Sequence, residues 1–290
     1  MNFDLWYFPA ARDWFSEWGM IYPGVWVLAL FWIFVFGACI GSFLNVCIWR
    51  IPRGESLSKA ASHCTVCGHP IRWYDNIPVA SYLILRGRCR HCRTSYSPSY
   101  FFVELFCGAL CALLVVKTGL MRQSAAVIPA RMLLIFFAVS CGLTDLRSRI
   151  VPDKLTFPGM IFALIAAAAF PAAWGAESAW QALFSSLLSG AVAGVLLAFF
   201  AVAGIVLSKR EILGMGDVKF VAMCAMLIGL PGTFFTLLAA SLTGTVWGLA
   251  VKRRLAASLP FVPFLAAAAV VWIFADRYIL DAFLYLNGKF

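Results

Sequence analysis

Eight long apolar segments dominate the chain and limit the folds that it can adopt. To within a few residues they cover 25–49, 100–120, 127–143, 155–174, 183–207, 217–230, 232–251 and 260–278. A helix that crosses a bilayer needs about 20 apolar residues, and the segments lack the period-two alternation of a membrane barrel. The sequence therefore predicts an all-α polytopic membrane protein with about eight transmembrane helices. Pro231 and Gly232 separate the sixth and seventh, which we expect to form a tight helical hairpin.

The composition excludes most soluble classes of protein. Hydrophobic residues make up 63% of the 290 residues and charged residues 12%, whereas a soluble domain has about 25% charged residues. A water-soluble enzyme, a disordered chain, a collagen and a coiled coil do not fit these figures. The net charge of +10 would suggest nucleic acid in a soluble protein, but in a membrane protein basic loops set the orientation. We therefore predict no nucleic-acid partner.

The basic residues also predict the topology. Of the 23 Lys and Arg residues, 17 lie in the gaps that follow the first, third, fifth and seventh helices or, for Lys219, at the edge of such a gap, which places these gaps in the cytoplasm. The predicted parts are an N-terminal tail with the first helix (1–49), a cytoplasmic insert (50–99) and a seven-helix membrane core (100–290). The tail carries four charges before residue 24 and does not fit a cleavable signal peptide, and we expect its aromatic residues at the membrane surface.

Four cysteines stand in the insert as two pairs, Cys64 with Cys67 and Cys89 with Cys92. Two CxxC pairs separated by 21 residues form a pattern typical of a four-cysteine zinc site. Two disulfides or four free thiols are the alternatives, and a reducing cytoplasm disfavours disulfides. An insert of about 50 residues is too small to be stabilised by a hydrophobic core alone and needs a cross-link such as a bound metal ion. Because the cysteines fill all four positions, the zinc is predicted to be structural.

Two aspartates lie where the apolar segments meet the predicted cytoplasmic side. Asp145 ends the third helix and Asp217 begins the sixth, so the topology allows them to meet. Paired carboxylates that share a site cannot both ionise, and one then acts as a base while the other acts as an acid. This is the chemistry of an aspartic peptidase. Ordinary interfacial ion pairs, or an N-cap role for Asp217, are the alternatives.

Neighbouring residues carry further expectations. Asp153 is expected to cap the fourth helix, and Lys219 and Glu104 to orient or pair with other groups. The glycines of two short motifs are expected to allow close approach of backbones; these are Gly37 and Gly41 in the first helix and Gly214 and Gly216 beside Asp217.

Taken together, the motifs resemble those of one family, the type IV prepilin leader peptidases, which are also N-methyltransferases. The resemblance rests on an ordered set that spans most of the chain: Gly41–Pro52, the two CxxC pairs, Asp75–Tyr82, Arg86–Cys89, Val103–Glu104, Asp145–Asp153 and Gly214–Lys219. Val262 departs from the family pattern, because glycine is frequent at its position.

The resemblance implies a function as well as a fold. Asp145 and Asp217 would be the catalytic pair, and the substrates would be type IV prepilins or type II secretion pseudopilins, cut after a glycine on the cytoplasmic side of the bacterial inner membrane. The family then methylates the new N-terminal residue with S-adenosylmethionine, and Asn45 is a candidate for the methyl-donor site only through the resemblance. Membrane lipid is the other expected partner. The rival interpretations are an ion- or proton-coupled transporter with intramembrane carboxylates and a zinc-ribbon scaffold without catalysis.

Overall fold

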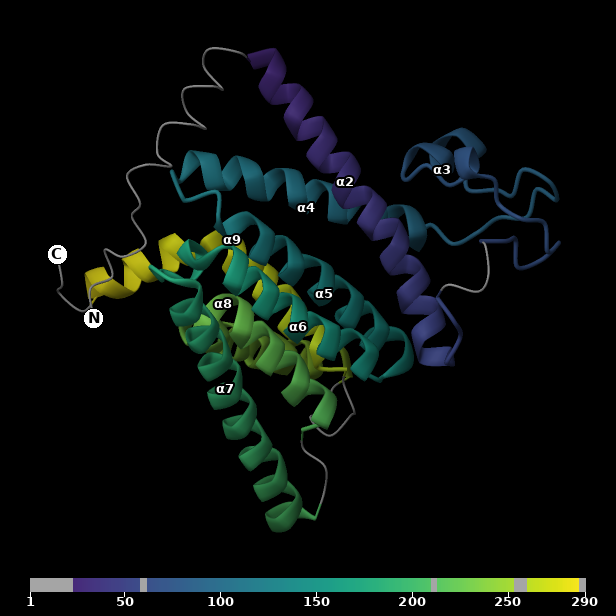
Figure 1. The fold of residues 1–290 in the computed structure, drawn as a ribbon. Helices are drawn as coiled ribbons and strands as arrows, with labels where there is room; N and C mark the ends of the chain where they lie inside the picture. Colours follow the sequence, from purple (N-terminus) through teal and green to yellow (C-terminus); the bar gives the residue numbers. More distant parts are fainter. Residues whose placement is uncertain (1–22, 58–61, 210–212, 253–259, 287–290) are drawn as a thin grey trace. The chain divides into compact units, whose positions relative to one another are not determined.

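The computed structural model describes residues 23–57, 62–209, 213–252 and 260–286. The aromatic N-terminal tail lies outside these ranges. The described chain consists of helices, turns and two isolated bridges, with no strand, which confirms the all-α prediction. It forms two compact units, an N-terminal unit that ends at Arg122 and a C-terminal unit that begins at Gln123 (Figure 1). The boundaries predicted near residues 49 and 99 stay predictions.

The N-terminal unit is built on two long helices, α2 (Pro23–Arg50) and α4 (Ser99–Leu120). A β-carbon added at Gly37 would lie 2.8 Å from the carbonyl oxygen of Cys107, and one added at Gly41 would lie 3.0 Å from the Cα of Glu104. The two backbones therefore touch at the glycines, as expected for a small-residue motif. Between the helices, the insert contains three short helices: η3 (Ile51–Arg53), η4 (Trp73–Asp75) and α3 (Ala80–Leu85).

The C-terminal unit contains five long helices: α5 (Val127–Ser148), α6 (Asp153–Ala169), α7 (Ala179–Ser208), α8 (Met215–Trp247) and α9 (Val262–Leu286). The short helices η5 (Pro171–Trp174) and η6 (Gly248–Lys252) follow α6 and α8. Asp145 of α5 bonds to Val262 of α9 at one end of the unit, and Arg131 pairs with Asp276 nearer the other. These two helices therefore run antiparallel. We call the end that carries Asp145 the aspartate end.

Helix α8 contains the predicted hairpin. Its backbone leaves the helical region at Gly229 (φ 70°, ψ 178°), two residues before Pro231. At the aspartate end, a β-carbon on Gly216 would meet Val151, and one on Gly244 would lie 3.8 Å from the ring of Phe264 in the first turn of α9. A straight helix would separate the two glycines by about 42 Å. The chain therefore turns back near Gly229, where the positive φ suits glycine, and the two halves run in opposite directions.

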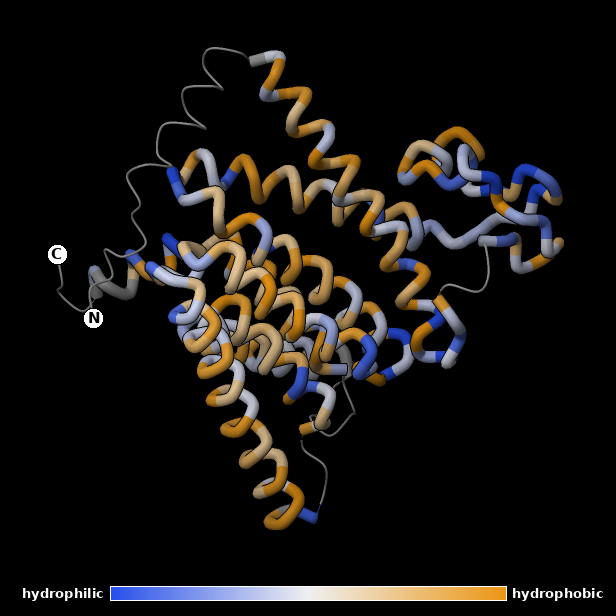
Figure 2. Tube along the Cα trace, in the orientation of Figure 1, coloured by the Kyte–Doolittle hydropathy of each residue, from blue (hydrophilic) through white to orange (hydrophobic). Residues whose placement is uncertain are grey.

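Six helices of the described chain have the length and composition of membrane spans. Five are continuous, namely α2, α4, α5, α7 and α9, whereas α8 reaches this length only over its two oppositely directed halves together. Large apolar side chains such as Phe199 and Val206 of α7 are exposed, and hydrophobic residues line the long helices in Figure 2. Such exposure is unfavourable in water and fits lipid contact. The chain is thus a multi-pass membrane protein, and a count of eight crossing segments stays a prediction.

A buried ion pair joins α5 to α9. Arg131 donates to Asp276 at 2.6 Å and to the amide oxygen of Gln123 at 2.7 Å, and the paired side chains are only 13% and 10% exposed. We expect Arg131→Met and Asp276→Leu each to lower the free energy of unfolding by about 3–5 kcal/mol, because each removes one partner of a buried ion pair. The double variant should be closer to the wild type than either single variant. Unfolding midpoints in detergent measure all four proteins, and a single variant as stable as the wild type would contradict this role.

Candidate active site and metal centre

Asp145 lies in the last turn of α5 and is 6% exposed. Its Oδ2 accepts a hydrogen bond from the backbone N–H of Val262, the first residue of α9, at 3.2 Å. The carboxylate therefore sits at the N-terminus of a helix, where free N–H groups and the helix dipole stabilise a negative charge. Helix α9 was not expected to take part in the site. No residue type in the sequence could signal its role, because the contact uses the backbone of Val262.

Asp217 lies in the first turn of α8 and is partly buried. Its Oδ2 accepts a hydrogen bond from the N–H of Gly214 at 3.3 Å, and the charge of Asp145 acts on it electrostatically. The structure thus brings together the two aspartates that the sequence singled out. Gly214, not Asp217, is the N-cap residue, and Asp217 bonds back to it as the third helical residue. Among the described residues no hydrogen bond reaches Oδ1 of either carboxylate.

The loop between α5 and α6 packs against the start of α8. Val151 packs against Gly216 at the place where a β-carbon of that residue would stand. Asp153 accepts a hydrogen bond from Lys219 at 2.6 Å. The expectation that Asp153 caps α6 was wrong. Pro152 is the N-cap residue, and no side chain caps this helix. Asp153 lies in the first helical turn and pairs with Lys219, which confirms the ion-paired role expected for that lysine.

The four predicted zinc ligands form a single cluster. The sulfur atoms of Cys64, Cys67, Cys89 and Cys92 all lie within 4.8 Å of one another, and those of Cys64 and Cys92 are 3.7 Å apart. A tetrahedral zinc ion with Zn–S distances of about 2.3 Å places its ligands about 3.8 Å apart, so the cluster fits this ion. All four cysteines are free, which argues against two disulfides.

The backbone prepares the cluster for a metal ion. Each CxxC pair forms a tight turn, or knuckle, closed by the same two backbone hydrogen bonds. In the first knuckle the N–H of Cys64 donates to the carbonyl of His69 and the N–H of Gly68 donates to the carbonyl of Cys64. In the second, Cys89 and Arg93 donate in the same way to Thr94 and Cys89. The backbone N–H groups of Cys67 and Val66 lower the pKa of the Cys64 thiol to about 6. The backbone N–H of His69 lowers the pKa of Cys67, but desolvation and the neighbouring thiols together outweigh it and raise this pKa to about 11. The thiolate is the form that binds zinc. The donor set therefore suits a closed structural site with no position for a substrate.

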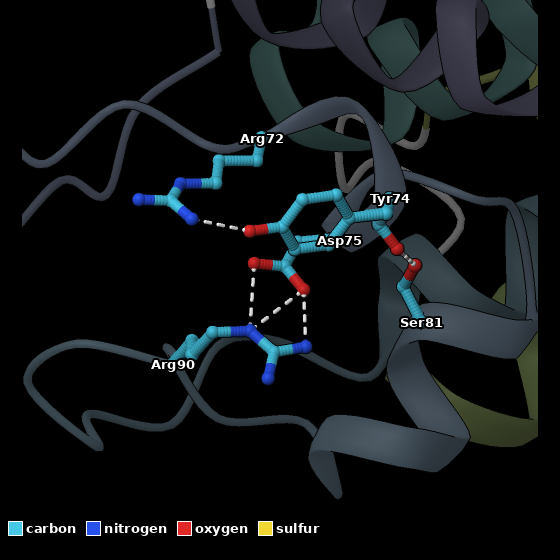
Figure 3. A network of polar contacts seen from close by, with 5 residues as sticks. All are labelled: Arg72, Tyr74, Asp75, Ser81 and Arg90. Atoms are coloured by element: carbon cyan, nitrogen blue, oxygen red, sulfur yellow. Dashed lines mark hydrogen bonds and ion pairs between the residues drawn. The ribbon is translucent and has the colours of Figure 1, made fainter.

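A polar network braces the insert beside the cluster (Figure 3). Asp75 accepts two hydrogen bonds from the Nε of Arg90 at 2.9 Å and one from its Nη2 at 2.6 Å. Arg72 donates to the hydroxyl of Tyr74, and Ser81 donates to the carbonyl of the same tyrosine. The hydrogen bonds from Arg90 hold the pKa of Asp75 below its usual value. The carboxylate therefore stays ionised at neutral pH and links η4 to the second knuckle.

Comparisons with known proteins identify relatives of this chain. The family model "Bacterial Peptidase A24 N-terminal domain" matches residues 35–118, and the model "Type IV leader peptidase family" matches residues 132–249. A "Type 4 prepilin-like proteins leader peptide-processing enzyme" of Escherichia coli O78:H11 is 35% identical over 82% of this chain and 91% of its own length. The chain belongs to the type IV leader peptidase family.

Other relatives of this family carry a double name. A "Prepilin leader peptidase/N-methyltransferase" of Myxococcus xanthus is 37% identical over 75% of this chain, a match that spans only 61% of that relative. A protein of the same name from Pseudomonas putida is 30% identical over 82% of this chain and 88% of its own length. No solved structure matches the chain. The transporter interpretation has no support among these relatives.

The second reaction of the leader peptidase family has no assigned site here. Asn45 is buried, and its amide donates to the carbonyl of Tyr100 at 3.1 Å, which ties α2 to the start of α4. Glu104 accepts a hydrogen bond from the N–H of Val79 at 2.8 Å, an orienting role of the kind expected. The described residues do not assign a place for the methyl donor, and the role of Asn45 stays a prediction.

The two glycines beside Asp217 offer a matched pair of substitutions. A β-carbon at Gly216 would lie 2.9 Å from the Cβ of Val151, which is fixed to the backbone, whereas one at Gly214 would meet only the carboxylate of Asp217 at 3.6 Å. We expect Gly216→Ala to lower the free energy of unfolding by about 1–3 kcal/mol through overpacking, and Gly214→Ala to keep the wild-type value to within about 0.5 kcal/mol. Unfolding midpoints in detergent test this contrast. Equal stability of the two variants would mean that Val151 does not pack against Gly216.

Proposed function

We propose that the chain is a bifunctional enzyme that removes the leader of type IV prepilins or type II secretion pseudopilins and methylates the new N-terminal residue. The observation that carries the proposal is the convergence of Asp145 and Asp217, from α5 and α8, at one end of the C-terminal unit. The relatives named prepilin leader peptidase/N-methyltransferase support the substrate class and the second activity.

The two carboxylates supply the acid and the base of peptide hydrolysis. The ionised aspartate takes a proton from a water molecule whose oxygen attacks the scissile carbonyl carbon, and the protonated aspartate donates its proton to the departing amide nitrogen. Val262 and Gly214 hold Oδ2 of the two carboxylates, which leaves Oδ1 of each for the water and the peptide. No covalent intermediate with the enzyme is needed.

The position of the pair suits a substrate that lies partly in the bilayer. Asp145 is three residues from the end of α5 and Asp217 is the third residue of α8, so both lie at a membrane boundary. A prepilin leader is short and basic and precedes an apolar helix, and its cleavage site therefore falls at such a boundary. The excess of basic residues in the corresponding loops supports the cytoplasmic side of the bacterial inner membrane.

The location of the carboxylates also separates this proposal from a transporter. Ion-coupled transporters place acidic groups near the middle of the bilayer, where the repeats meet. Asp145 and Asp217 are instead bonded to backbone N–H groups at the starts of α9 and α8.

In the second reaction, S-adenosylmethionine is a co-substrate that transfers its methyl group from sulfur to the new terminal amine. We propose that the insert takes part, since the C-terminal unit holds both aspartates and leaves the insert free for another role. Deletion of residues 55–95 should then abolish methyl transfer. Intact methyl transfer in that variant would place the donor site elsewhere in the chain.

A single incubation tests both activities. Purified full-length protein is mixed with a prepilin and with S-adenosylmethionine that carries a labelled methyl group, and the mass of the product is measured. The expected product has lost its leader and gained one labelled methyl group. An unchanged prepilin mass would refute the peptidase proposal, and leader loss without methyl gain would refute only the second activity.

A further inference from the structure

Four arginines of the insert surround a hollow that the proposed peptidase chemistry does not use. The hollow has a volume of about 530 Å³ and is open to solvent. Arg86, Arg88, Arg90 and Arg93 line it together with Ile84, Leu85 and the cluster residue Cys89. We call it the arginine hollow. It lies entirely within the N-terminal unit, whereas both aspartates belong to the C-terminal unit.

Most of the positive charge around the arginine hollow is uncompensated. Arg90 is paired with Asp75, but Arg86, Arg88 and Arg93 are exposed and form no ion pair with a carboxylate among the described residues. Three arginines gathered at one concave surface favour a ligand with a negative charge and several acceptor oxygens. A phosphodiester has both properties, whereas a cationic sulfonium or a basic leader peptide does not.

Helix α3 exposes apolar side chains next to the hollow, and Ile84 is one of the residues that line it. Leu83 is 60% exposed and Ile84 is 71% exposed, and Figure 2 shows the hydrophobic α3 beside the hydrophilic residues that follow it. Two adjacent aliphatic side chains exposed next to a row of arginines form an amphipathic surface. Such surfaces bind the membrane interface, with the apolar groups among acyl chains and the basic groups at the headgroups.

Helix α3 is attached close to the N-terminal end of α4. Helix α3 begins one residue after Val79, whose N–H donates to Glu104, the sixth residue of α4. Glu104 is about 7–8 Å along the axis from the first residue of α4, and α4 is long and apolar enough to cross the membrane. The headgroup layer on each side of a bilayer is about 5–8 Å thick. The attachment point of α3 therefore lies within about one headgroup-layer thickness of the N-terminal end of α4.

The turn that carries α3 is held in an unusual conformation. Val79 has φ 64° and ψ −53°, and the N–H of Ala80 bonds to the carbonyl of Pro78 at 2.6 Å. This is a γ-turn with positive φ, which is strained for a β-branched residue. The hydrogen bond to Glu104 holds the turn against α4, so α3 has a fixed position relative to the membrane span.

We propose that the arginine hollow binds the headgroup of an anionic phospholipid, with Leu83 and Ile84 inserted among its acyl chains. The phosphate bridges Arg86, Arg88 and Arg93, and the bound lipid fixes the insert against the bilayer. The inference is independent of the proposed peptidase activity, since it concerns a surface of the N-terminal unit alone.

Native mass spectrometry of the full-length protein in detergent tests the proposal, with dioleoylphosphatidylglycerol and dioleoylphosphatidylcholine as probes. We expect the wild type to retain phosphatidylglycerol in preference to phosphatidylcholine. The variant Arg86→Gln/Arg88→Gln/Arg93→Gln should lower that retention by at least about tenfold, since basic residues near an anionic lipid surface supply much of the attraction to it. The variant Arg122→Gln/Lys154→Gln/Lys209→Gln removes the same charge elsewhere and should retain the lipid. Equal retention by the two triple variants would overturn the proposal.

Two further measurements separate other ligands and guard against misfolding. The variant Leu83→Ser/Ile84→Ser keeps the arginines and should also retain less phosphatidylglycerol, and wild-type retention in this variant would overturn the insertion of α3. Excess sn-glycerol 3-phosphate or a glutamate-rich peptide should not displace the lipid, and displacement by either would assign the hollow to free phosphates or to an acidic protein instead. In wild-type protein, amide exchange of residues 80–93 should be slower in phosphatidylglycerol nanodiscs than in phosphatidylcholine nanodiscs. Identical exchange would overturn the proposal without any variant.

Discussion

Asp145→Asn and Asp217→Asn are each expected to lower the rate of leader cleavage by on the order of 10³-fold, with the fold retained. The loss follows because asparagine neither takes a proton from water nor donates one to the leaving amine. The fold should survive because an asparagine oxygen can still accept the hydrogen bond from Val262 or from Gly214. Cleavage of a purified prepilin by purified variants, followed over time by mass, gives the rates.

The double variant makes this prediction sharper. When two groups act as one unit, removing either group already abolishes the contribution of both. The double variant Asp145→Asn/Asp217→Asn should therefore cleave the prepilin about as slowly as either single variant. The control is Asp281→Asn, which changes an exposed carboxylate of α9 and should cleave at the wild-type rate. Wild-type cleavage by either single variant would refute the pair. Multiplied losses in the double variant would show that the two aspartates act separately.

The sequence could predict the parts of the structure that depend on local chemistry. The apolar segments specified the long helices, since their length and composition allow few other structures in lipid. Pro231, two residues after Gly229, marked the reversal inside α8, and the spacing of four cysteines specified the cluster. In each case a few residue types at fixed spacing determine the geometry.

The contacts that complete the site could not be predicted in the same way. The hydrogen bond between Asp145 and Val262 uses the backbone N–H of Val262, so the type of side chain at position 262 does not reveal it. Valine can donate this bond as well as the glycine that is frequent at this position in the family. The pairing of Asp153 with Lys219 depends on how α6 and α8 pack. Capping was the simpler expectation for an aspartate after a proline, but tertiary contact determined its partner.

Cys64→Ser is expected to remove zinc from the insert and to unfold it. A structural zinc site contributes an apparent 10–16 kcal/mol in small domains, whereas an ion pair at the surface such as Asp75–Arg90 contributes far less. The polar network around Tyr74 therefore cannot replace the metal. Elemental analysis should find about one zinc ion per wild-type chain and almost none in the variant.

Limited trypsin digestion reports the unfolding directly, because exposed arginines such as Arg86, Arg88 and Arg93 lie within the insert. The variant should be cut there at low protease concentration, while the wild type resists. Cys39→Ser is the matched control, since Cys39 is an exposed free cysteine of α2 outside the cluster, and this variant should keep both its zinc and its resistance. A wild-type protein without zinc would exclude the metal site, and a resistant Cys64→Ser protein would show that the insert folds without it. Since both aspartates lie in the C-terminal unit, the variant should lose zinc without the 10³-fold loss of cleavage expected for Asp145→Asn, which distinguishes a structural metal from a catalytic one.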